Sequence, residues 1–179
     1  MTGRMLVAGV GNIFLGDDGF GVAVANRLAG ADLPSWVQVA DYGISGMHLA
    51  YDLADGYETA ILVDTAQRGE APGTLTVIEA GRPAEPAGAF AQTRMFDAHG
   101  MQPDVVLGVL DMLGASSARV LVVGCEPASL DYGMELSEPV AKAVGAAVQI
   151  VMDLIAESAD KTASSAEEEG ASHVPRHTR

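Results

Sequence analysis

Short apolar runs that alternate with segments of helical periodicity constrain the fold of this chain more than any other feature of its sequence. The runs are rich in β-branched residues and are bounded by Gly, Asp or Pro, as buried strands are. They span residues 5–10, 37–40, 60–63, 75–78 and 120–123. Because they lack the polar alternation of a half-exposed strand, we expect both faces of their sheet to be covered.

Three other segments carry apolar residues at helical spacing, which predicts amphipathic helices. Their apolar positions are Phe20, Val24 and Leu28; Val106, Leu110 and Leu113; and Val140, Val144, Ala147, Val151 and Ile155. Buried strands joined by helices predict an α/β fold: a single three-layer domain with a mostly parallel, twisted sheet and helices on both faces. A chain of 179 residues can bury a sufficient core without disulfides.

Residues 1–156 are predicted to form this domain, and residues 157–179 are predicted to form a disordered tail. The tail is rich in Ser, Ala and Glu, and Val174 is its one large apolar residue. Such a segment has too little apolar surface to offset the entropy lost on ordering. We therefore expect the functional residues to lie within the first 156.

Composition excludes several classes of function. With 24 acidic residues against 10 Lys and Arg, the chain would repel a nucleic-acid backbone, so we expect no nucleic-acid partner. The single cysteine, Cys125, excludes a disulfide framework, and its apolar surroundings predict a buried side chain rather than a nucleophile. The apolar stretches are too short for a signal peptide or for the roughly 18 residues of a membrane span. We expect a cytoplasmic protein with no membrane partner.

Acidic residues follow the predicted strands. Asp17 and Asp18 follow the first strand, Asp41 the second and Asp64 the third. Ligands bind beyond the carboxyl ends of the strands in an open α/β sheet, so we expect these carboxylates at one edge. His99 precedes a predicted helix and can reach the same edge.

Asp18, Asp64 and His99 together form an O,O,N donor set, which suits a divalent ion such as Ni²⁺, Zn²⁺ or Mn²⁺. A dinucleotide site is disfavoured, because Phe14 occupies the place of the third glycine in the fingerprint. Asp17 and Asp18 would also oppose a phosphate at the start of the first helix. One of these two acids is expected to cap that helix, which leaves the other free to face a ligand.

Six ordered motifs give the chain a specific resemblance to a known family. They are Gly9-Val10-Gly11-Asn12 with Asp17-Asp18-Gly19-Phe20-Gly21-Val22; Asp41-Tyr42-Gly43-Ile44-Ser45-Gly46-Met47; Asp64; Ala71-Pro72-Gly73-Thr74; Asp97-Ala98-His99-Gly100-Met101; and Gly124-x-x-Pro127-x-Ser129-Leu130 with Leu136-Ser137. Through them, residues 4–156 resemble the hydrogenase maturation endopeptidases, which remove the C-terminal extension from the large subunit of [NiFe]-hydrogenases.

The resemblance implies a protease that acts on the large-subunit precursor after nickel has been inserted into it. Asp18, Asp64 and His99 match the family residues that meet this nickel, which is supplied by the substrate and serves as a recognition element. Zn²⁺ or Cd²⁺ can substitute for it in such a site. Many members carry Glu at the position of Asp18 and Thr at the position of Ile44.

The hydrolytic chemistry stays open at this point. Either the metal polarises the carbonyl or a bound water, or Asp41 or Asp17 acts as general base on water. Gly43, Ser45 and Gly46 match the segment expected to bind substrate. The partner is the precursor, and a monomeric enzyme is expected. The alternative is a non-catalytic metal- or nucleotide-binding module that checks or escorts the precursor.

Overall fold

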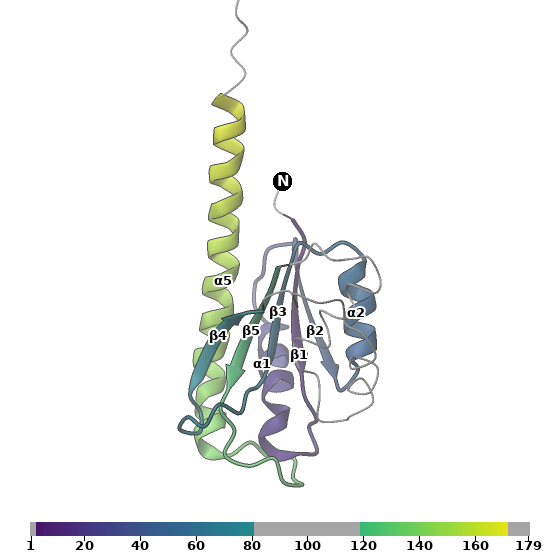
Figure 1. The fold of residues 1–179 in the computed structure, drawn as a ribbon, viewed down its shortest axis with the longest axis vertical. Coiled ribbons are helices and arrows are strands. Elements are labelled where there is room, and N and C mark those ends of the chain that lie inside the picture. The colour runs from purple at the N-terminus through teal and green to yellow at the C-terminus, as the bar shows by residue number, and fades with distance from the viewer. Residues whose placement is uncertain (1–2, 81–118, 172–179) are drawn as a thin grey trace, which may run out of the picture.

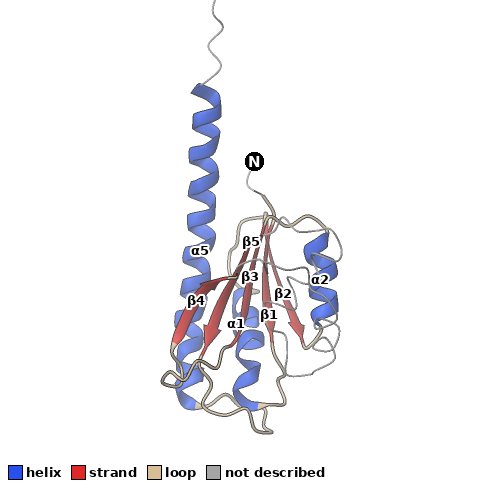
Figure 2. Cartoon of the chain, viewed as in Figure 1, coloured by secondary structure: helices blue, strands red, loops and turns tan. Residues whose placement is uncertain are grey.

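The computed structural model describes residues 3–80 and 119–171, with side chains described as far as residue 160. In this part of the chain a single sheet is flanked by helices (Figure 1, Figure 2). The strands are β1 (Met5–Val10), β2 (Val37–Gly43), β3 (Thr59–Thr65), β4 (Leu75–Glu79) and β5 (Arg119–Cys125). The helices are α1 (Phe20–Leu28), α2 (Gly46–Ala54), α5 (Glu138–Ala171) and the short 3-10 helix η1 (Gly16–Gly19).

The strand order is β2-β1-β3-β5-β4. β2, β1, β3 and β5 are parallel, whereas β4 pairs antiparallel with β5 at the sheet edge. Each predicted run lies within one of these strands, and the prediction of a mostly parallel sheet is confirmed. Because β2 and β3 lie on opposite sides of β1, the chain changes direction across the sheet there, and a ligand crevice is expected at such a switch point.

Side chains alternate between two apolar cores, one on each face of the sheet. Met5 and Val7 of β1 face the core that contains α1 and α5. Leu6 and Ala8 face the second core, which contains Leu49 and other residues of α2. The predicted three-layer domain with helices on both faces is therefore confirmed.

Helix α2 is an element that hydrophobic periodicity did not predict. Its buried side chains are Leu49, Ala50 and Leu53, which cover only about one turn. The helix also begins at a glycine, Gly46. So short a stripe cannot be distinguished from a loop by periodicity alone. The helix predicted around residues 106–113 lies outside the described residues.

Helix α5 confirms the predicted helix around residues 140–155, since the apolar positions predicted there are buried in the core. It continues to Ala171, so the prediction of a disordered tail is wrong over residues 157–171. Ala, Glu and Lys are good helix formers, and they extend a helix already stabilised by packing. Residues 172–179 lie outside the described part of the chain.

The segment Glu138–Asp160 of α5 is long and apolar enough to cross a membrane, by length and composition alone. In the structure, one apolar face of this segment packs inside the domain. Val140, Val144 and Val151 are buried in the core shared with α1 and β5. This face of α5 is therefore part of the interior of the domain.

Candidate active site

Two aspartates lie at the switch point of the sheet. Asp18 follows β1 in the helix η1, and Asp64 lies near the end of β3, the strand that pairs with β1. Both side chains are half-buried. The structure therefore brings together, at the carboxyl edge, two of the three residues that the sequence predicts as metal ligands.

The loop after β1 turns sharply because Gly11 has a φ of +129°, which side chains rarely adopt. A Cβ on Gly11 would lie 1.8 Å from the backbone oxygen of Asp18, so only glycine allows η1 to approach this closely. The Asn12 N–H then donates a 2.8 Å hydrogen bond to Oδ2 of Asp18. The glycine thus places the Asp18 carboxylate over the end of β1.

Thr65 connects the two carboxylates. Its N–H donates to Oδ1 of Asp64 at 2.7 Å, and its hydroxyl donates to Oδ1 of Asp18 at 3.1 Å. One residue at the end of β3 therefore orients both acids. Nothing in the sequence pattern singles out Thr65 beyond its place next to Asp64.

The Asp64 carboxyl holds its proton more tightly than an ordinary aspartate. Its pKa is raised from 3.8 to about 7, mainly by burial and also by the nearby Asp18 charge, while hydrogen bonds from Thr65 oppose the shift. A half-buried pair of like charges is stabilised by a proton or by a cation. This arrangement suits a divalent metal, for which carboxylate oxygens are acceptable ligands.

Asp17 points away from this pair and is only 1% exposed. Its carboxylate accepts hydrogen bonds from the N–H groups of Ala128, Ser129 and Ser137, and from the Ser137 hydroxyl, at 2.6–3.1 Å. Burial alone would raise its pKa, but these donors lower the pKa below its ordinary value. Oδ2 accepts three of these hydrogen bonds and Oδ1 accepts one, so both oxygens of the carboxylate are engaged.

The structure thus separates the two adjacent acids by role. Asp18 faces Asp64, whereas Asp17 connects η1 to the loop between β5 and α5. Neither caps α1 through its side chain, so that expectation is wrong. Because Asp17 is buried and both of its carboxylate oxygens accept hydrogen bonds, we do not assign it the catalytic role predicted from the sequence.

The loop after β2 lies beside the loop after β1, since the Gly11 N–H donates to the Gly43 carbonyl at 2.9 Å. Asp41 is exposed, and its Oδ1 accepts the Gly43 N–H at 2.8 Å. Ser45 precedes α2, and its Oγ is 2.8 Å from Nδ1 of His48. Gly46 begins α2. The residues predicted to bind substrate therefore form one continuous turn, and His48 is an added neighbour that no sequence signal indicated.

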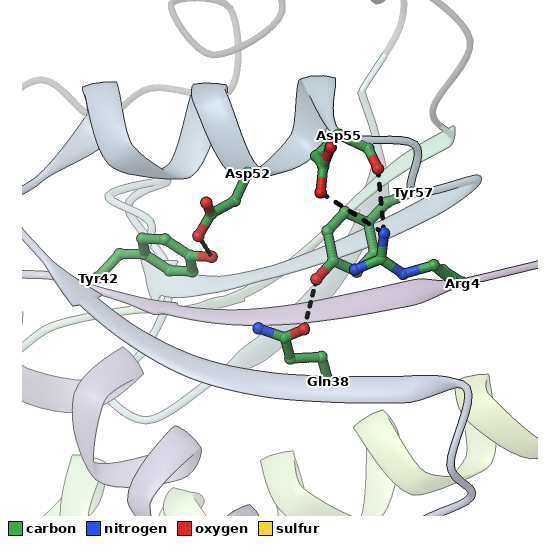
Figure 3. Close-up of polar contacts among 6 residues, drawn as sticks. All are labelled: Arg4, Gln38, Tyr42, Asp52, Asp55 and Tyr57. Carbon is green, nitrogen blue, oxygen red and sulfur yellow. Dashed lines mark hydrogen bonds and ion pairs between the residues drawn. The ribbon is translucent and has the colours of Figure 1, made fainter.

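Two buried tyrosines join α2, and the loop that follows it, to strand β2 (Figure 3). The Tyr42 hydroxyl donates to Asp52 of α2 at 2.6 Å, and burial followed by this contact raises the pKa of Tyr42. The Tyr57 hydroxyl donates to Gln38 of β2 at 2.6 Å, with the Arg4 guanidinium over its ring. The Tyr42–Asp52 contact thus joins the end of β2, which carries Asp41, to α2.

Cys125, the last residue of β5, and the neighbouring Glu126 both have structural roles. Cys125 is fully buried, and burial raises the pKa of its thiol to about 11, which is consistent with the predicted small apolar role. Glu126 accepts hydrogen bonds from the N–H groups of Arg68 and Gly69, and the Arg68 N–H lowers its pKa. Glu126 therefore holds the loop that follows Asp64.

Comparison with known families identifies the class of protein. The sequence profile of the hydrogenase maturation proteases matches residues 22–154. This chain belongs to the hydrogenase maturation protease family. It is accordingly a peptidase, and the resemblance described from its motifs is confirmed.

Relatives of this protease cover most of its length. A putative hydrogenase maturation protease from Methanocaldococcus jannaschii is 33% identical over 83% of this chain and 94% of its own. The hydrogenase 2 maturation protease of Escherichia coli is 31% identical over 87% of this chain and 92% of its own.

Solved structures share the fold of the protease. The hydrogenase 2 maturation peptidase from Thaumarchaeota archaeon SCGC_AB-539-E09 has a TM-score of 0.65 at 34% identity, over 86% of this chain and 98% of that one. The hydrogenase maturating endopeptidase HybD from Escherichia coli has a TM-score of 0.68 at 28% identity, over 87% and 93%. The α/β single-domain assignment of the protease is therefore confirmed.

His99 of the protease lies outside the described residues. Among the residues described, no group of three His, Cys, Asp or Glu side chains is close enough to hold a metal. Asp18 and Asp64 thus supply two oxygen donors to this edge, and the predicted nitrogen donor stays a prediction.

Proposed function

We propose that this protease removes the C-terminal extension from a [NiFe]-hydrogenase large-subunit precursor after nickel insertion, with the substrate-borne nickel as its recognition element. The observation that most supports this proposal is the pair of half-buried carboxylates, Asp18 and Asp64, to which Thr65 donates hydrogen bonds at the switch point. Membership in the hydrogenase maturation protease family supports the substrate class.

In this proposal Asp18 and Asp64 each offer an oxygen to the nickel, and His99 supplies a nitrogen. An ion that arrives with ligands from the precursor needs only part of a coordination sphere from the enzyme, in contrast to a resident structural metal, which is fully enclosed by its own protein. The cation offsets the burial and the Asp18 repulsion that together raise the pKa of Asp64. Zn²⁺ and Cd²⁺ are suitable probes of the same donors.

Asp41 is the proposed general base or substrate-positioning residue. Its Oδ1 accepts the Gly43 N–H, and no hydrogen bond to its Oδ2 is formed within the described residues. Oδ2 can accept a proton from water as the water oxygen attacks the scissile carbonyl, and that proton then passes to the departing amine. The turn of Gly43, Ser45 and Gly46 is proposed to position the peptide, since it adjoins both Asp41 and the Gly11 loop.

We also propose that the protease acts as a cytoplasmic monomer. The apolar face of α5 is buried in the domain core, which supports an enzyme that uses this helix for its own folding. The acidic composition, with a net charge of −14, supports a protein partner rather than a nucleic acid.

The deciding experiment presents purified protein with nickel-loaded and nickel-free precursor and measures product masses. We expect loss of the extension from the loaded precursor alone. Asp64→Asn, Asp18→Asn and His99→Ala should each abolish cleavage, whereas Asp32→Asn, an exposed acid before β2, should cleave normally. Equal cleavage of both precursors would contradict metal-directed recognition, and binding without any mass change would favour the escort module.

A further inference from the structure

Exposed apolar side chains gather on one edge of the domain. Of the eight large hydrophobic side chains exposed in the described residues, six lie on the loops that follow β1, β2 and β5 or in the first turn of α2. We call these six the apolar rim: Ile13, Phe14, Ile44, Met47, Tyr132 and Met134. Large exposed apolar groups that cluster in this way mark interaction surfaces.

The apolar rim lies on the loops next to the carboxylate pair. Asp18 and Asp64 follow β1 and β3, which lie between β2 and β5 in the sheet. Ile44 therefore lies on the β2 side of the pair, and Tyr132, which is 94% exposed, follows β5.

The loops that carry the rim are joined by backbone hydrogen bonds. The Gly133 N–H donates to the Phe14 carbonyl at 3.0 Å, and the Gly16 N–H donates to the Gly133 carbonyl at 2.8 Å. The buried Asp17 carboxylate also joins these two loops, because it accepts hydrogen bonds from the N–H groups of Ala128 and Ser137. An ordered apolar surface loses less entropy on binding than a loose one.

The charged residues on the loops that carry the rim are all acidic. Residues 11–19, 41–47 and 126–137 contain no Lys or Arg, and Asp41, Asp131 and Glu135 are exposed there. A partner that fits must present apolar residues bordered by Lys or Arg, because opposite charges favour encounter and like charges oppose it.

From these observations we infer that the apolar rim is the docking surface for the folded body of the large-subunit precursor around its metal, and not only for the extension peptide. This inference rests on the proposed function. The acidic pair beside the rim then meets the metal while the rim contacts the surrounding apolar, basic-bordered surface.

The test measures initial cleavage rates against the concentration of nickel-loaded precursor. We expect Phe14→Ser and Tyr132→Ser to raise the half-saturating concentration about tenfold, with kcat within about twofold of the unsubstituted enzyme. Tyr51→Ser and Val77→Ser are the controls, because these side chains are also large, apolar and exposed but lie away from the rim, and they should change neither quantity.

Other results overturn the inference in distinguishable ways. If the unsubstituted enzyme cleaves the precursor and the rim and control variants behave alike, the rim has no part in docking. An equal defect of the rim variants on a short synthetic peptide spanning the cut would assign the rim to the extension alone. A dimer in sedimentation that Tyr132→Ser dissociates would make the rim a self-interface. Failure of the unsubstituted enzyme to bind and cleave overturns the proposed function as well.

Discussion

At this site, some acidic residues are proposed to act on the substrate, whereas others hold the loops in place. Asp64 retains an unfavourable buried charge above its raised pKa, and Thr65 donates to both members of the acidic pair. Asp17, one residue before Asp18, is instead fully engaged with backbone donors. The acids proposed to be functional are those whose charge the surrounding donors neutralise incompletely, and perturbed pKa values of this kind are common at functional sites.

Asp64→Asn is expected to stabilise the fold while it abolishes cleavage. The folded pKa of Asp64, about 7, lies above its ordinary 3.8, so stability is lost as the pH rises between these values. Asparagine carries no charge and keeps an oxygen for the Thr65 N–H. Urea unfolding should show the variant more stable by about 1 kcal/mol at about pH 8, with a smaller difference at about pH 5. An equal difference at both values would contradict the assigned pKa.

Thr65→Val is expected to lower cleavage of the nickel-loaded precursor about tenfold, because valine has the shape of threonine but no hydroxyl to orient Asp18. Thr65→Ser keeps the hydroxyl and should restore most of the rate. Measured kcat and half-saturation together with urea unfolding distinguish positioning from folding. A serine variant as slow as the valine variant would show that the hydroxyl is dispensable.

At the scale of elements, the site depends on loops held together across large sequence separations. Asp17 of η1 accepts donors from Ala128, Ser129 and Ser137, which lie more than 100 residues away. These hydrogen bonds keep the loop between β5 and α5 against the loop after β1. The geometry of the apolar rim therefore depends on a residue outside it.

Asp17→Asn should destabilise the protein by about 2–4 kcal/mol, because an amide nitrogen would face backbone N–H donors in a buried site. Since its folded pKa is lowered, the native stabilisation is present above the ordinary pKa of 3.8 and is lost only as the pH falls through the lower folded value. Chemical unfolding at neutral pH measures the effect. Asp131→Asn, an exposed acid of the same loop, is the control and should remain near the unsubstituted stability.

Elements differ in how far the sequence predicts them. The buried strands and helix α1 follow directly from apolar runs and helical spacing. The antiparallel direction of β4 does not, since an apolar run carries no sign of direction. For the site, the edge and the acids could be predicted from the residues that come directly after each strand. Which of Asp17 and Asp18 faces inward could not, because it depends on donors more than 100 residues away.

At the scale of the whole molecule, the folded body ends well before the chain does. The last buried side chain of α5 within the described residues is Ile155. The rest of α5 projects beyond the sheet (Figure 1). The predicted domain boundary at residue 156 therefore stays a prediction that truncation can test.

Removal of residues 161–179 is expected to leave the thermal midpoint within about 2 °C and the cleavage rate unchanged, because Ile155 is the last buried side chain in the described part of α5. A shorter protein that ends at residue 148 lacks Val151 and Ile155 and should be destabilised by several times the effect of one buried methyl group. Calorimetry compares the two. If the protein that ends at residue 160 is less stable than the full chain, the projecting turns of α5 contribute to the fold.

The direction in which α5 projects also matters for laboratory use. Strand β1 begins, and α5 ends, on the side of the sheet opposite to the carboxyl edge (Figure 1). An affinity tag, fluorescent protein or surface tether joined near residue 3 or residue 171 would thus be attached remote from the catalytic face. Immobilisation through either attachment point should orient that face outward, so that a large substrate can approach it from solution.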